Sequence, residues 1–195
     1  IPPSIMTADE VETSIGTLRF FDGLPNPQTV DLVYDNLDRM RGVEVFLDFV
    51  PLASIESLRR GMASIGVEKA NQILLYDELM DSNSLFLTGN TDTVYAIGML
   101  DLKRDGPMVV EIPPGAGPGT VNDAYFRFVT DMGAPGPDRG KGGKYLLLPP
   151  DHEGEVPEGY FVSKSPTYVN WLPLRGFLKD GKPDDAVRMW TEGLR

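Results

Sequence analysis

Apolar residues in the first third of the chain recur at helical spacing. Asn26 and Pro27 supply a helix cap and a proline suited to the first helical position, and we expect Pro51 to end the helix. Between them the apolar positions fall three and four residues apart, which predicts one long amphipathic helix. The stripe consists of Val30, Val33, Leu37, Met40, Val43, Leu47 and Val50, widened near its end by Val45, Phe46 and Phe49. We expect the last two turns to be buried on all sides.

Two shorter helices are predicted on either side of this one. Thr7 and Glu10 have the spacing of a capping box, which opens a helix that runs to Ile15. Ser54 begins the other helix, and Gly66 stops it. The first third of the chain is therefore expected to be helical.

After about residue 70 the apolar period changes from 3.6 to 2, which indicates strands. Strand-like segments cover residues 73–76, 84–87, 93–102, 107–112, 124–130, 144–148, 160–163 and 167–174. Helices followed by strands, without alternation, favour an α+β fold over a doubly wound sheet. We predict N-terminal helices packed on an antiparallel β-sheet or sandwich of jelly-roll type, with a short C-terminal helix. Residues 1–70 would form a helical cap and residues 71–195 the β-rich part of the same domain.

The end of the chain predicts one more helix. Asp180 and Gly181 form a turn, and the helix that follows from Pro183 should place Val187 and Trp190 inward. Because the sequence stops inside or just after this helix, we expect a fragment that lacks a second, C-terminal domain.

Composition narrows the function more than the fold. The 195 residues are 41% hydrophobic, carry a net charge of −11 and include no cysteine. Such a charge repels nucleic acid and anionic membranes, and no apolar run is long enough to span a bilayer. The lack of cysteine excludes thiol nucleophiles and sulfur-ligated zinc, and it suits an exported protein. A Ser-His-Asp triad could use only His152, and no motif identifies a cofactor or a metal site.

Polar side chains open the predicted strand at 93–102. Asn90 and Asp92 lie just before it, and Tyr95 should share a face with Ile97 and Met99. The polar pair could bond its own backbone in an Asx turn. Alternatively, Asp92 acts as a general acid or base beside Tyr95, with Asn90 binding substrate.

Acidic, basic and aromatic residues alternate along the predicted strand at 124–130. Asp123, Tyr125, Arg127 and Asp131 would share one face of that strand. They could form a solvated sheet face in which Arg127 bridges two carboxylates. The alternative is a polar pocket, with Arg127 and Tyr125 binding an anionic group and Asp131 as acid or base.

A local basic patch follows at residues 135–145. Arg139 and Lys144 could hold a substrate carboxylate or phosphate, or could simply belong to a solvated hairpin loop.

Several segments together resemble the domain-of-unknown-function family 1254. They include Ser-Leu-Phe-Leu-Thr-Gly-Asn-Thr-Asp-Thr-Val-Tyr at 84–95, Gly-Pro-Asp-Arg-Gly at 136–140, and segments at 13–18, 20–23, 33–38, 143–150 and 174–178. The resemblance covers nearly the whole chain and departs from the family at residues 114–122. It implies an exported bacterial protein, periplasmic or secreted, that continues into a sheet-rich domain of family 1214. It supplies no catalytic residues.

Two functions follow as hypotheses. The first is an enzyme acting on a small polar or carbohydrate-like substrate, which requires Asp92 and Arg127 to converge within about 10 Å. The second is a non-catalytic module that binds a small polar ligand or another protein. For partners, we expect the C-terminal sheet domain to dock on this chain, and homo-oligomerisation is a further expectation.

Overall fold

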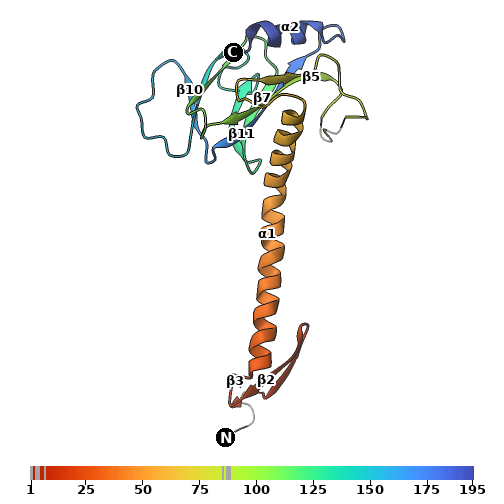
Figure 1. The fold of residues 1–195 in the computed structure, drawn as a ribbon, viewed down its shortest axis with the longest axis vertical. Helices are drawn as coiled ribbons and strands as arrows, with labels where there is room; N and C mark the ends of the chain where they lie inside the picture. The colour runs from red at the N-terminus through yellow and green to blue at the C-terminus, as the bar shows by residue number, and fades with distance from the viewer. Residues whose placement is uncertain (1, 3–4, 7, 85, 87–88) are drawn as a thin grey trace. The chain divides into compact units, whose positions relative to one another are not determined.

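The computed structural model describes residues 2, 5–6, 8–84, 86 and 89–195. The chain divides into two compact units, Ile1–Val50 and Pro51–Arg195. Figure 1 follows the chain through its helices and strands. The α+β class is confirmed, because helices and sheets are both present and segregated along the chain.

The first unit opens with a small antiparallel sheet, so the helix predicted from Thr7 to Ile15 is wrong. Its strands are β1 (Glu10–Thr13), β2 (Gly16–Phe21) and β3 (Leu24–Pro25). The turn between β1 and β2 is closed by the Thr13 hydroxyl, which donates to the carbonyl of Gly16. Across the strands Arg19 pairs with Glu10 at 2.9 Å. Glu10 thus serves a cross-strand pair, and the described residues 8–15 contain no helix.

The long helix α1 (Pro27–Ser64) continues past Pro51, the residue expected to end it. Asn26 caps its start, since its side-chain oxygen accepts the Thr29 N–H at 2.8 Å. Pro51 lies inside the helix, so the two predicted helices are one. The carbonyl that loses its donor is that of Leu47, whose side chain is exposed, so water can replace the missing bond.

The expected burial of the helix around residues 45–50 is not found. Val45, Phe46 and Leu47 are all more than half exposed in the structure. Near the start of the helix Thr29 is buried, and Val30 is half-buried. The apolar stripe therefore predicted the helix correctly but not its surroundings.

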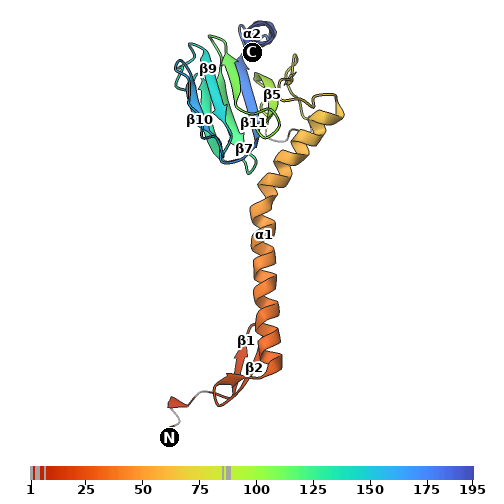
Figure 2. The same ribbon diagram turned by 60° about the vertical axis from the view of Figure 1, so that its left-hand side comes forward.

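The second unit contains two β-sheets and the short helix α2 (Asp184–Gly193). The five-stranded sheet has the order β4 (Ile73–Leu75), β5 (Thr93–Asp101), β11 (Val169–Phe177), β7 (Pro118–Asp123), β8 (Phe128–Gly133). The three-stranded sheet has the order β10 (Phe161–Lys164), β9 (Gly143–Leu148), β6 (Met108–Ile112). All pairs are antiparallel except β10 with β9, which is parallel and departs from the prediction. Figure 2 shows the strands of both sheets, with α2 beside β5 and β11.

The two faces of β5 lie in two different cores. Val94 and Ala96 belong to a core shared by both sheets and α2, in which Trp190 is 3% exposed. Tyr95 and Ile97 belong to a second core that includes Ile55 from the end of α1. Met99 packs on this second core, so the predicted face of Tyr95, Ile97 and Met99 is confirmed. A sheet covered on both faces explains why β5 is apolar at nearly every position.

Two strands differ from the prediction. The expected strand at 124–130 is instead a turn followed by β8, so residues 123–131 do not line one strand face. Strand β7 was missed, because it begins with Pro118 and Gly119, at the end of a segment rich in glycine and proline. A Cβ on Gly119 would lie 2.5 Å from the Leu174 side chain, so glycine allows β7 to approach β11. The segment predicted as a strand at 84–87 lies partly outside the described residues.

The loop at 136–142 is fixed by a buried carboxylate. Asp138 is 4% exposed and accepts hydrogen bonds from the Tyr145 hydroxyl and from the Gly142 N–H. Gly142 has φ 80°, and a Cβ there would lie 2.6 Å from the carbonyl oxygen of Ile112. The glycines and aspartate of this loop therefore serve its backbone path.

Replacing Tyr145 with Phe should destabilise the second unit. The substitution removes one donor to a buried carboxylate, which typically costs about 1–3 kcal/mol. Urea unfolding of the two proteins measures the difference. Tyr160→Phe, at a half-buried tyrosine of the same unit, is the matched control, and equal losses in both variants would contradict the role given to Tyr145.

The same tyrosine should make stability sensitive to alkaline pH. Burial, and then the hydrogen bond to Asp138, raise the pKa of Tyr145 above its ordinary value. The unfolded chain therefore loses this proton at lower pH than the folded protein does. Its contribution is complete below about pH 10 and is lost as the pH rises through the folded pKa. Thermal unfolding from about pH 9 to 11 should show a steeper decline for the unmodified protein than for Tyr145→Phe.

Candidate functional site

The polar residues before β5 are used by a turn. The Asn90 side-chain oxygen accepts the N–H groups of Asp92 and Thr93, at 3.2 and 3.0 Å, and the Thr93 hydroxyl at 2.6 Å. The Tyr95 hydroxyl, whose residue is 2% exposed, accepts the Asn90 N–H at 3.0 Å. This geometry is an Asx turn, and it uses the side-chain oxygen of Asn90, while the Tyr95 hydroxyl binds the Asn90 backbone. Asp92 is exposed beside it.

The structure does not bring Asp92 and Arg127 together. Thr93, the residue after Asp92, lies opposite Phe177 on β11, whereas Asp123, next to the turn of Arg127, lies opposite Asn170. Asn170 and Phe177 are at opposite ends of β11, roughly 23 Å apart at the usual rise of a strand. The convergence that the enzyme hypothesis requires is absent.

Asp131 is also remote from the other acid/base candidates. It is half-buried on β8, opposite Thr120 of β7. Strands β7 and β11 lie between β8 and β5, so Asp131 is about 14 Å from the strand that carries Tyr95. Asp92, Asp131 and Tyr95 therefore do not form one constellation.

A different carboxylate is the centre of the most organised polar cluster. Asp123 is fully buried at the end of β7. One of its oxygens accepts the N–H groups of Tyr125 and Arg127, each at 2.9 Å. The other is bound by Arg127, with Nε at 2.7 Å and Nη2 at 2.6 Å. Asp123 thus holds the whole turn from 124 to 127 in one conformation.

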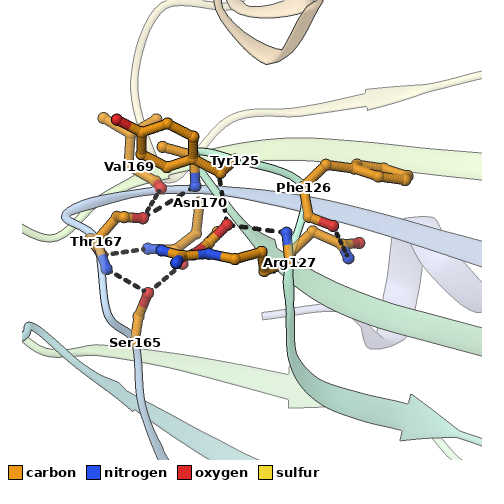
Figure 3. Close-up of polar contacts among 10 residues, drawn as sticks. Tyr125, Phe126, Arg127, Ser165, Thr167, Val169 and Asn170 are labelled. Carbon is orange, nitrogen blue, oxygen red and sulfur yellow. Dashed lines mark hydrogen bonds and ion pairs between the residues drawn. The ribbon is translucent and has the colours of Figure 1, made fainter. Parts of the chain in front are cut away.

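Figure 3 shows that this turn faces the segment that leads into β11. The Thr167 hydroxyl accepts the Ala124 N–H at 2.9 Å and donates to the Val169 carbonyl. Ser165 and Asn170, both buried, are joined at 2.6 Å between hydroxyl and side-chain oxygen. Short polar side chains therefore connect the β7–β8 turn to β11 through a satisfied network.

Arg127 is the exposed member of this cluster. Its side chain is 60% exposed, and its guanidinium lies over the Tyr125 ring, 5.2 Å from the centroid. Two of its five N–H groups are used by Asp123, so three remain on the outer side. A guanidinium that a carboxylate and a ring already hold in place can donate to a second carboxylate at a lower cost in conformational entropy.

Asp123 itself is poorly suited to catalysis. Four donors occupy its oxygens, and Arg127 neutralises its charge. A general base needs a free lone pair within reach of a proton on the substrate. The exposed side of Arg127 is therefore the part of this cluster that is placed to meet a ligand.

The basic patch after β8 is built as a loop. Arg139 is exposed with φ 52°, and its N–H bonds the Gly136 carbonyl. Lys144 is exposed on β9 and lies opposite Glu111 on β6, an arrangement that favours a cross-strand charge pair. Local turn and strand contacts account for both residues.

The described part of the chain contains no further candidate for a catalytic or metal-binding site. The His152 Nε2 is buried without a hydrogen-bond partner among the described residues. Those residues hold no cluster of acids or histidines suited to a metal ion. None of their helices is long and apolar enough to cross a membrane.

Sequence reasoning placed Arg127 and Tyr125 in a candidate site but missed how they are held. The expected extended strand hid the turn in which Asp123 accepts the N–H groups two and four residues ahead. An aspartate is itself a signal for such a turn, because its side chain can accept the N–H two residues ahead. Phe126, at φ 63°, shows the strain of the same turn.

Asp123→Ala should destabilise the second unit. It strands two backbone N–H groups and one side of the Arg127 guanidinium, at a cost of about 2–3 kcal/mol. Asp92→Ala, at an exposed aspartate, is the control and should change stability by less than about 0.5 kcal/mol. Chemical denaturation of both variants measures the difference. If the two aspartates proved equally dispensable, Asp123 would not organise the turn.

Comparisons with known proteins support the fold and not a function. The chain is similar to the crystal structure of the VPA0106 protein from Vibrio parahaemolyticus, with 20% identity and a TM-score of 0.51. The match covers 76% of this chain and 36% of that one, so this chain spans about a third of its length. No curated protein matches the chain.

A family model, described as a protein of unknown function (DUF1254), matches residues 70–195, which is more than half of the chain. The match contains the segments at 84–95, 136–140, 143–150 and 174–178, whereas those at 13–38 lie before it. The chain therefore belongs to the DUF1254 family.

Proposed function

We propose that this chain is a non-catalytic module that binds a small organic carboxylate at Arg127. One observation carries the proposal: the exposed Arg127 guanidinium is held in place by the fully buried Asp123 and by the Tyr125 ring. Its outer N–H groups offer the paired donors that a carboxylate accepts.

The proposal is favoured over an enzyme for two reasons. The acid/base candidates Asp92 and Asp131 are far apart in the sheet, and Asp123 has its lone pairs occupied. Binding needs only the preorganised cation, whereas proton transfer needs a second group within hydrogen-bond reach.

The net charge of −11 limits the affinity that we expect for an anionic ligand. Most of the surface repels an anion, so the local guanidinium works against the field of the whole protein. The affinity for a carboxylate should therefore be modest.

Thermal shifts against a panel of organic acids, neutral sugars and divalent metals test the proposal. A ligand at ten times its Kd adds about 1.4 kcal/mol, which raises the Tm by roughly 3–5 °C for a domain of this size. Organic carboxylates such as benzoate should raise the Tm, and their neutral amides should leave it unchanged. Titration calorimetry on the best acid then gives the affinity directly.

Two variants separate binding from stability. Arg127→Gln should abolish the shift caused by the acid, and Arg127→Lys should weaken it, because a lysine cannot present paired donors. Arg175→Gln is the matched control: Arg175 also lies over a tyrosine ring, that of Tyr95, at 5.6 Å. If Arg175→Gln abolished the shift and Arg127→Gln did not, the site would be elsewhere. A shift from sugars or metals alone would contradict the ligand class.

We also propose that the protein acts in the periplasm or outside the cell. The absence of cysteine supports this, because such a protein needs no protection of thiols in an oxidising compartment. Fractionation of cells that express the full-length protein tests it, and recovery only with cytoplasmic markers would contradict it.

A further inference from the structure

An apolar cavity opens in the second unit, between its two sheets and α2. Its volume is about 360 Å³. Eleven of its fourteen lining residues are apolar, so its surface is mainly hydrocarbon. Close-packed protein interiors contain few voids larger than a water molecule, which makes a cavity of this size unusual. The residues that shape it include Ala70, Ile73, Leu100, Val110, Leu172 and Trp190.

The burial of the lining residues shows where the cavity opens. Leu100, Val110 and Leu172 are at most 5% exposed, so they form its floor. Asn71 and Thr191 also line it, but both are exposed. The opening therefore lies between the segment before β4 and the end of α2, where a ligand can enter from solvent.

Small side chains keep this space open. Ala70 and Ala96 are both buried and both line the cavity, and a larger side chain at either position would occupy part of it. The helix α2 has ten residues, and Trp190 is the one among them that is both buried and part of the lining. The cavity thus follows from alanines placed opposite a short helix.

The chemistry of the lining disfavours water and charged groups as occupants. An ordered water needs several polar partners, and an apolar cavity of roughly 150 Å³ stays dry and binds benzene. The lining has one charged residue, Arg195, and its guanidinium already donates to the carbonyls of Leu194 and Glu192. A charge placed on the floor would lose its hydration without gaining a partner.

We propose that this cavity binds a neutral alkyl chain with a hydroxyl group at one end. The chain would lie on the apolar floor, and the hydroxyl would stay at the opening beside Asn71 and Thr191. The Thr191 hydroxyl donates to the Val187 carbonyl, so its oxygen can still accept a hydrogen bond from the ligand.

The size of the cavity sets the length of the ligand. Its volume is more than twice the volume that holds a benzene ring, which suits a chain of about eight to twelve carbon atoms. Small-molecule sites typically have volumes of about 300–1,000 Å³ and apolar walls with a few polar groups. This site is separate from Arg127 and does not depend on carboxylate binding there.

Thermal shifts with octan-1-ol test the proposal on the chain of residues 1–195. At ten times its Kd the alcohol should raise the Tm by roughly 3–5 °C. Octane-1,8-diol is the matched control, because its second hydroxyl would meet the apolar floor without a partner and should make the rise clearly smaller. Octanoate should also give a smaller rise in Arg127→Gln, a variant that lacks the proposed carboxylate site.

Tryptophan fluorescence locates the bound alcohol. The chain has two tryptophans: Trp190 lines the cavity, whereas Trp171 lies in the second core. Bromine quenches the emission of an indole that it contacts. 8-Bromooctan-1-ol should therefore quench most of the emission of Trp171→Phe, which retains Trp190, and little of the emission of Trp190→Phe.

Filling the cavity gives a further pair of variants. Ala70→Phe places a ring in the space and should remove the rise in Tm that octan-1-ol causes. Ala53→Phe, at an exposed alanine of α1, is the control and should keep it. Because the quenching measurement does not use Ala70→Phe, it decides the question even if that variant fails to fold.

Several results would overturn the proposal. One is an unchanged Tm of the unmodified protein with octan-1-ol, and another is equal quenching of the two tryptophan variants. A folded Ala70→Phe that keeps the full rise would also exclude this cavity as the site. Equal rises from the alcohol and the diol, or a larger rise from octanoate in Arg127→Gln, would contradict the class of ligand.

Discussion

The pairing of β5 with β11 is the constraint on which the second unit depends. Nine residues of each strand lie in uninterrupted antiparallel register, from Thr93 opposite Phe177 to Asp101 opposite Val169. Both strands are covered on both faces, so a slip by one residue would exchange the contents of the two cores. On the other side of β5, Gly98 allows β4 to lie close, since a Cβ there would lie 2.7 Å from the Ile73 side chain. The α2 helix packs on this pair, where Gly176 leaves space for Trp190.

This register also decides which polar groups can meet. It places Asp92 at one end of the sheet, and Asp123 with Asn170 at the other. The polar residues at the first end are used by the Asx turn of Asn90, whereas those at the second end hold Arg127 outward. A charged group that is held rigidly binds a ligand at a lower entropic cost, but only if part of it still faces solvent. Arg127 is such a group. The favoured site therefore follows from where the strands end.

The sequence predicted those parts of the fold in which apolar residues follow a clear pattern. The stripe from Val30 onward, β5, β9 and α2 all appear where the period indicates them. The errors occur where a short local motif was used to predict structure although contacts with distant residues, or the surrounding helix, determine it. Glu10 has capping-box spacing but pairs with Arg19 across a hairpin, and Pro51 is tolerated inside a helix. Strand β7 was missed because Gly119, and Gly117 just before the strand, allow close contacts with residues of β11 that are distant in sequence.

The site was predicted in part, for the same reason. Arg127 and Tyr125 could be selected as unusual residues, but the turn that carries them is also held by Thr167, which accepts the Ala124 N–H from 43 positions later in the chain. No local pattern can reveal a partner at that separation. The turn at Asp123, by contrast, is local and could have been predicted from an aspartate that bonds N–H groups just ahead of it.

The segments by which this chain resembles its family mainly fix the backbone conformation of turns and loops. In the Gly-Pro-Asp-Arg-Gly loop, Asp138 is buried against Tyr145, and Arg139 and Gly140 both have positive φ. In the segment at 84–95, Asn90 closes the turn before β5. Such residues maintain a fold and need not perform a reaction. The residues that could differ between binding specificities are those held outward by the scaffold, and Arg127 beside Tyr125 is the best example in the described chain.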